Sequence, residues 1–178
     1  MRDVSIIVTV EETGQPLLRS LLPKLLAMPY DGGLEVIVVD KMHDKDLEEW
    51  LEDMEARYSF LSHTFCPASA RGLDVHRLAL ILGAKAANFD FLVLLPLDES
   101  LATGSWLRGL VSSAAEGHDV TIGLTRPRSR WKSFRSLFRR TFSLTRPSSS
   151  IILCRRDVLL RGRNVNLSEC NILKLYQS

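Results

Sequence analysis

The sequence predicts a mostly parallel α/β sheet with helices on both faces, in a single domain of 178 residues. Apolar runs of strand length alternate with longer stretches in which leucines recur at helical spacing. The strand-length runs are continuously apolar, which is typical of strands that are buried on both faces of a parallel sheet. With 46% hydrophobic and 25% charged residues, the composition is that of a folded globular domain.

The elements follow one another from the start of the chain. Strands are predicted at residues 4–10, 34–40, 61–66, 90–96, 118–124 and 149–155, and helices at 13–28, 43–58, 73–89 and 104–117. Thr13 is the expected N-cap of the first helix, and Pro23 is expected to kink or interrupt that helix. Early acidic residues in 43–58 suit the positive end of a helix dipole.

Cysteine usage and hydropathy indicate a reducing compartment. The cysteines are odd in number and widely spaced, without CxxC, so we expect buried free thiols: Cys66, Cys154 and Cys170. No apolar run reaches the roughly 18–20 residues that span a bilayer, and the opening MRDVSIIVTVEE is unlike a secretory signal. We therefore expect a cytoplasmic protein.

Charge divides the chain unevenly. Residues 1–119 contain 10 Lys or Arg against 19 Asp or Glu, whereas residues 120–178 contain 13 against 2. Within the basic part, residues 126–147 interleave cations with aromatic side chains. Three interpretations remain open: the segment covers the acidic half, lies in the headgroups of an anionic membrane, or brings Arg135, Arg139 and Arg140 to a phosphate group. No nucleic-acid-binding module accompanies these cations, so nucleic acid is not an expected partner.

Polar residues follow several predicted strands at the edge where parallel α/β sheets bind ligands. They are Thr9, Glu11, Glu12, Asp40, Asp98 and Glu99. Each acid either caps the next turn or helix, or contacts a ligand, and the pattern alone leaves both interpretations open. The four histidines (His43, His63, His76 and His118) show no triad or metal-ligand spacing and are expected to be ordinary side chains.

Two blocks resemble family 2 glycosyltransferases of the GT-A fold. The first is VSIIVTVEETGQPLLRSLLPKLLAMPYDGGLEVIVVDKMHD, similar to the family's opening strand, leucine-rich helix and second strand ending in VVDD. The second is GAKAANFDFLVLLPLDESLATGSWLRGLV, similar to its glycine, paired alanines, apolar strand, Asp-x-Asp motif and tryptophan-leucine helix. The resemblance covers roughly residues 3–125 and implies a GT-A-type, Rossmann-like fold that binds a nucleotide-sugar.

The resemblance also implies roles for single residues. Asp40 falls on the aspartate that binds the nucleobase, and Thr9 and Glu11 line the same pocket. Asp98 falls on the second aspartate of Asp-x-Asp, which helps to hold a divalent Mg or Mn ion against the diphosphate, with Glu99 as a further candidate ligand. The implied activity is sugar transfer from a nucleoside-diphospho-sugar to a glycan or lipid-linked acceptor, with peripheral contact to the inner face of the membrane.

Departures from the family pattern support the alternative that the chain is a catalytically inactive relative. Pro96 replaces the first aspartate of the motif, Leu80 replaces a common arginine, and Lys41 replaces the second acid of the DDG turn. No clear counterpart of the family's catalytic Glu-Asp pair occurs downstream, so no residue is assigned as catalytic base. The chain is thus predicted to be either a transferase or an inactive relative that binds a nucleotide or a partner. Residues 1–125 would form its nucleotide-sugar-binding half, and residues 126–178 a basic acceptor-side or membrane-facing segment.

Overall fold

The computed structural model describes residues 2–67, 69, 74–97, 106–113, 119–125, 142–143, 151–161, 164–165 and 171–175. In chain order the elements are β1 (Val4–Val10), the 3₁₀ helix η1 (Glu12–Gly14), α1 (Gln15–Leu26), β2 (Leu34–Asp40), α2 (Lys45–Arg57), β3 (Leu61–Phe65), α3 (Val75–Ala86), β4 (Phe91–Leu95), α4 (Trp106–Ser113), β5 (Val120–Thr125), β6 (Phe142–Ser143), β7 (Ile151–Arg155), α6 (Arg156–Leu160), β8 (Asn164–Val165) and β9 (Asn171–Leu175).

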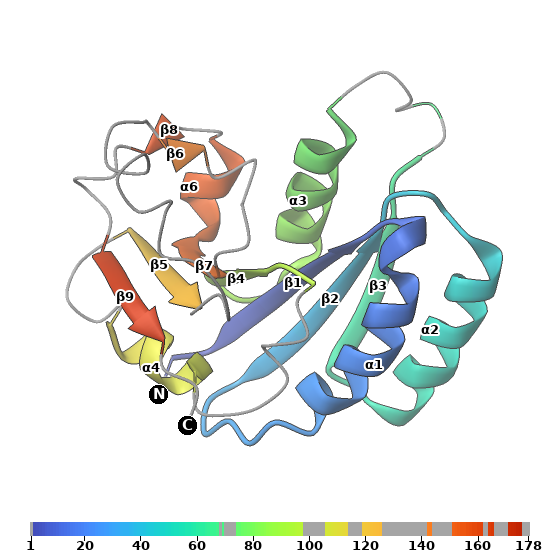
Figure 1. The fold of residues 1–178 in the computed structure, drawn as a ribbon, viewed down its shortest axis with the longest axis horizontal. Coiled ribbons are helices and arrows are strands. Elements are labelled where there is room, and N and C mark those ends of the chain that lie inside the picture. Colours follow the sequence, from blue (N-terminus) through green and yellow to red (C-terminus); the bar gives the residue numbers. More distant parts are fainter. Residues whose placement is uncertain are drawn as a thin grey trace.

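A seven-stranded sheet in the order β3-β2-β1-β4-β7-β5-β9 forms the centre of the molecule (Figure 1). The first four strands in this order are parallel, as predicted. β7 is antiparallel to both of its neighbours, β4 and β5, whereas β5 and β9 are parallel. A short two-stranded ladder pairs β6 with β8. β7 and β9 belong to the basic residues 120–178, so strands from the acidic and the basic parts of the chain form one sheet.

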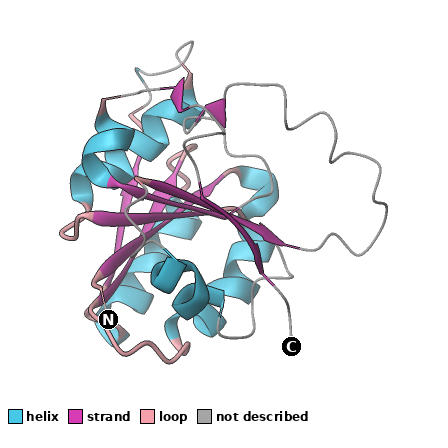
Figure 2. Ribbon diagram, turned by 90° about the vertical axis from the view of Figure 1, so that its left-hand side faces the viewer, coloured by secondary structure: helices cyan, strands magenta, loops and turns pink. Residues whose placement is uncertain are grey.

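Helices cover both faces of this sheet, which Figure 2 shows nearly edge-on. One face packs against α1, α2 and α4 through alternate residues of each strand, which in β1 are Val4, Ile6, Val8 and Val10. The other face packs against α3 and α6 through the intervening positions, including Ile7 and Leu94. The period-2 alternation of each strand therefore decides which helical layer a side chain meets. The prediction of a two-faced α/β sheet is confirmed.

Two details of the first helix differ from the prediction. Gly14, and not Thr13, is the N-cap, since residues 12–14 form a 3₁₀ turn ahead of α1. Of the kink or interruption predicted at Pro23, the interruption is wrong, because the helix continues to Leu26. Proline removes one hydrogen bond, to the carbonyl of residue 19. Because Arg19 and Pro23 are both exposed, water can solvate that carbonyl.

A buried polar cluster joins the amino ends of β1 and β2 to the loop before β4. The Ser5 hydroxyl donates to the Glu35 carboxylate, which also accepts the Asn88 backbone N–H at 2.6 Å and the Asn88 side-chain amide at 2.7 Å. Ser5 is fully buried and Glu35 is 9% exposed. The buried polar groups of Ser5 and Glu35 thus have hydrogen-bond partners. They lie at the amino ends of β1 and β2, opposite the carboxyl ends of the strands.

The prediction of buried free thiols is confirmed for the two cysteines among the described residues. Cys66 and Cys154 are buried free thiols, and Cys170 lies outside the described residues. No helix in the described ranges combines the length and apolar character needed to cross a bilayer.

Candidate functional site

The polar ends of the first strands meet at one edge of the sheet. Val10 is in register with Asp40, and Val8 with Leu95, so β1, β2 and β4 end side by side. Phe65, the last residue of β3, is also in register with Asp40. The sequence prediction that these strand ends share an edge is confirmed.

Thr9 and Asp40 reach this edge on opposite faces of the sheet. Thr9 continues the Ser5 and Ile7 side of β1 and faces α3, as its place in a pocket beside that helix shows. Asp40 continues the positions of β2 that pack toward α1 and α2. The structure therefore brings the two residues to the same end of the sheet without placing them on one face.

The Asp40 carboxylate closes the turn that leads into α2. It accepts the backbone N–H of Met42 at 2.8 Å and that of Asp44 at 2.6 Å, and the residue is only 4% exposed. Asp44 then caps α2 by accepting the Leu47 N–H at 2.9 Å. These contacts match the capping interpretation of Asp40, and the nucleobase contact stays a prediction.

Glu11, Lys41 and His76 form a polar cluster across the ends of β1 and β2 and the start of α3. The Lys41 ammonium donates to the Glu11 carboxylate and lies 3.2 Å from Nδ1 of His76. The Lys41 side chain is 7% exposed and that of Glu11 is 62% exposed. The hydrogen bond from Lys41, with its positive charge, lowers the pKa of the Glu11 carboxyl.

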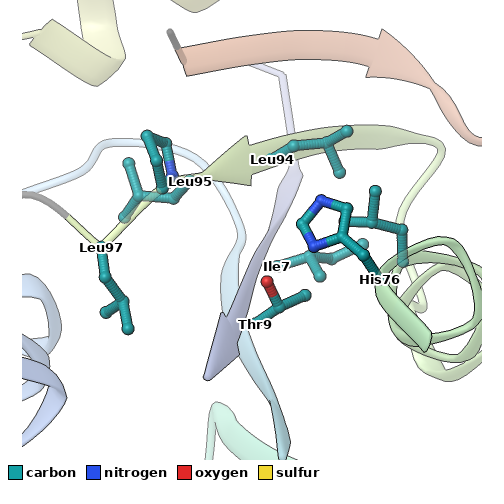
Figure 3. Close-up of a pocket in the computed structure, with 8 residues that line it drawn as sticks. Ile7, Thr9, His76, Leu94, Leu95 and Leu97 are labelled. Carbon is teal, nitrogen blue, oxygen red and sulfur yellow. The ribbon is translucent and has the colours of Figure 1, made fainter. Parts of the chain in front are cut away.

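A pocket of about 160 Å³ opens beside this cluster, between β1, β4 and α3 (Figure 3). Its lining is mainly aliphatic, and it includes Leu80 at the position where the resemblance implies an arginine. Thr9 and His76 supply its polar groups, and in Figure 3 the imidazole ring projects from α3 toward the sheet above Thr9. Pro96 and Leu97 line the side where β4 ends. The pocket therefore offers an apolar surface with a hydroxyl and an imidazole.

An aromatic pair lies at the same edge, beyond β2 and β3. The rings of His43 and Phe65 stack in parallel, with centroids 3.6 Å apart. His43 has a φ of 55°, a left-handed conformation that non-glycine residues seldom adopt. Phe65 is 38% exposed, so the pair offers a partly open aromatic surface.

The described residues at the end of β4 offer no ligand to a divalent ion. Pro96 offers no donor atom, Leu97 is apolar, and the described ranges contain no group of three or more His, Cys, Asp or Glu suited to a metal. The metal prediction therefore depends on Asp98 and Glu99, which lie outside the described residues. Arg135, Arg139 and Arg140 lie outside them too.

The sequence predicts His76 to be an ordinary side chain, and Lys41 stands out only as the replacement of an acid in the family pattern. The structure instead joins the two across the strand ends, with His76 in the pocket wall. The sequence held one signal, a lysine directly after the last residue of an apolar strand. The approach of α3 to β1 and β2, which brings residues 35 positions apart together, is not visible in local sequence.

The fold is of the GT-A type, a Rossmann-like, mostly parallel sheet with helices on both faces. The structure superimposes on glycosyltransferases over most of its length. Neither the family models nor the curated proteins contain a sequence match to this chain.

Among the similar structures is the mannosyltransferase PcManGT from Pyrobaculum calidifontis in complex with GDP-Man and Mn²⁺, with a TM-score of 0.68 and 17% identity over 98% of this chain and 56% of that one. S. aureus TarS 1-349 gives a TM-score of 0.58 and 18% identity, covering 88% of this chain and 48% of that one. Glucosyl-3-phosphoglycerate synthase from Mycobacterium tuberculosis, in complex with Mn²⁺, UDP and glucosyl-3-phosphoglycerate, gives a TM-score of 0.57 and 17% identity, covering 98% of this chain and 70% of that one. The chain thus spans about half the length of the first two proteins.

Proposed function

We propose that this chain is a family 2-like glycosyltransferase domain that transfers a sugar from a nucleoside-diphospho-sugar to a glycan or lipid-linked acceptor. The observation that carries the proposal is the superposition of 98% of the chain on a mannosyltransferase in complex with GDP-Man and Mn²⁺, at a TM-score of 0.68. The polar strand ends of β1 and β2 lie at the edge where sheets of this type bind ligands.

In this proposal Thr9, Glu11, Asp40 and Asp98 contact the nucleotide-sugar. Thr9 and Glu11 lie beside the pocket and its neighbouring cluster. Asp40 would have to use lone pairs that its two backbone contacts leave, because each carboxylate oxygen accepts more than one hydrogen bond. A divalent Mg or Mn ion, if bound, would be held by Asp98 with Glu99 and would neutralise charge on the diphosphate.

The reaction would be a displacement at the anomeric carbon. The acceptor hydroxyl oxygen forms the new bond to that carbon, the bond to the diphosphate oxygen breaks, and the hydroxyl proton passes to a base. No residue of this chain is assigned as that base. The arginines Arg135, Arg139 and Arg140 are proposed to contact phosphate groups, of a membrane surface or of the donor.

A second candidate function is that of an inactive relative which binds a nucleotide or a partner. Pro96 favours this alternative, because it puts an apolar ring without ligand atoms where the resemblance implies a metal-binding aspartate. Binding and turnover separate the two functions: an inactive relative binds the nucleotide and never releases UDP or GDP from the sugar donor.

Titration calorimetry with UDP and GDP, with and without Mn²⁺, tests the proposal. We expect one nucleotide to bind, and Asp98→Ala to weaken the Mn²⁺-dependent part about 10- to 100-fold, as expected for losing roughly 1.5–3 kcal/mol of contact with a charged group. Asp53→Ala, on an exposed position of α2, is the matched control and should bind as the wild type does. Absence of binding to both nucleotides under both conditions would contradict the proposal.

A further inference from the structure

Exposed apolar side chains gather at the carboxyl ends of β2 and β3. Two of the three large apolar residues that are exposed in the described part of the chain lie there: Met42, which is 57% exposed, and Phe65. The partly exposed ring of His43, next to Met42 in the sequence, stacks on the ring of Phe65. Single apolar residues on a surface need no explanation, but two parallel rings form a surface that suits a flat ligand.

The ring of His43 is held in place from several directions. Its backbone has a left-handed φ of 55°, a conformation that the neighbouring contacts maintain. The Asp40 carboxylate accepts the backbone N–H groups on either side of it, those of Met42 and Asp44. The Glu48 carboxylate lies 3.5 Å from Nε2 of the ring. The aromatic surface is therefore formed in advance, so a ligand that stacks on it does not have to order the rings first.

The stacked pair lies beside Asp40, the residue to which the resemblance gives a nucleobase contact. Phe65 is in register with Asp40 on the neighbouring strand, so their Cα atoms are about 5 Å apart. The Asp40 carboxylate itself is nearly buried and is hydrogen-bonded to its own turn. A nucleobase has no net charge, so the carboxylates of Glu11 and Glu12 at this edge do not repel it as they would a phosphate group.

We propose that the stacked rings of His43 and Phe65 form a platform on which the base of the nucleotide-sugar stacks. The inference rests on the proposed function and deepens it, because it assigns the base contact to an aromatic surface and makes Asp40 the residue that positions the turn. Loss of one contact between a base and an aromatic side chain lowers affinity about 5- to 150-fold.

Titration calorimetry with GDP and UDP in the presence of Mn²⁺ tests the platform. Phe65→Leu keeps an apolar side chain at the end of β3 but removes the ring, and it should weaken nucleotide binding at least about fivefold. His43→Gly should weaken binding as well. Glycine adopts a φ of 55° without steric cost, so this variant keeps the turn.

Phe60→Leu is the matched control. It makes the same substitution directly before β3, about 17 Å along the strand from Phe65 at 3.3 Å per residue. It should bind nucleotide as the wild type does. Circular dichroism melts show whether each variant is folded. Because His43→Gly changes a partly exposed side chain, the test does not depend on the folding of Phe65→Leu alone.

Proton NMR of the nucleotide, with diamagnetic Mg²⁺ in place of Mn²⁺, reports contact with the base itself. The ring current of an aromatic side chain moves protons above its face upfield. On binding to the wild type, H8 of guanine or H5 and H6 of uracil should move upfield by more than the ribose protons. The shift should be smaller in Phe65→Leu, whereas a purely structural role of the pair would leave it unchanged.

The possible outcomes separate the platform from the proposed function. Unchanged nucleotide affinity in folded Phe65→Leu and His43→Gly overturns the platform, as does an equal loss in Phe60→Leu. Base protons that do not move upfield while the nucleotide binds also overturn it. All three results leave the proposed function standing. Absence of GDP and UDP binding to the wild type contradicts both.

Discussion

Replacing Glu35 by alanine should destabilise the fold without changing the candidate site. The Glu35 carboxylate accepts N–H and O–H groups from Ser5 and Asn88 in a buried position. The alanine variant leaves the Ser5 hydroxyl and the Asn88 backbone N–H without this acceptor, at about 1–3 kcal/mol for each buried donor. Because Asn88 is exposed enough for water to reach it, we expect a loss of about 3 kcal/mol in the free energy of unfolding.

Urea unfolding followed by circular dichroism measures this loss. For a chain of this length, about 3 kcal/mol corresponds to a decrease of roughly 6–12 °C in Tm. Glu35→Gln, which keeps one acceptor oxygen, should lose about half as much. Glu52→Ala, on the exposed face of α2, should stay within about 0.5 kcal/mol of the wild type. A loss below about 0.5 kcal/mol in Glu35→Ala would refute the view that this cluster joins the strands.

Two predictions concern other parts of the chain. Burial, with a smaller effect of the Asp157 charge, raises the pKa of the Cys154 thiol to about 12, so at pH 8 roughly one thiol in ten thousand is ionised. Iodoacetamide followed by peptide mass spectrometry should modify Cys154 only after denaturation, and labelling of the native protein at the rate of a free thiol would contradict this. If the basic segment binds anionic membranes, replacing Arg135, Arg139 and Arg140 by glutamine should lower the binding constant for phosphatidylserine vesicles at low salt by roughly 100-fold, at about 1 kcal/mol per cation. Sedimentation with the vesicles measures this binding. A wild-type protein that does not sediment shows that the segment is not a membrane element.

The strands were the most predictable part of the fold. The apolar runs at 4–10 and 34–40 became β1 and β2 at the predicted bounds, because continuous β-branched residues suit a strand buried on both faces. The sequence did not reveal β9, or that β7 is antiparallel and lies between β4 and β5. Strand neighbours depend on contacts between distant segments, which local periodicity does not encode.

The first helix shows how tertiary context overrides a local rule. Pro23 predicts a kink or an interruption, and α1 continues through it to Leu26. Buried leucines on both sides of the proline, Leu22, Leu25 and Leu26, hold the helix against the sheet. Their burial offsets the one hydrogen bond that proline removes.

By itself, the sequence determined the two-faced α/β sheet and the presence of polar residues at the ends of its parallel strands, because both follow from patterns a few residues long. Only the tertiary structure decided how those residues are used. It turned Asp40 into the carboxylate that closes a turn, put Thr9 on the opposite face, and joined Lys41 to His76 beside the pocket. The Lys41–His76 contact arises from the packing of α3 against β1 and β2, which brings together residues 35 positions apart in the chain, whereas the Asp40 contacts lie within one turn.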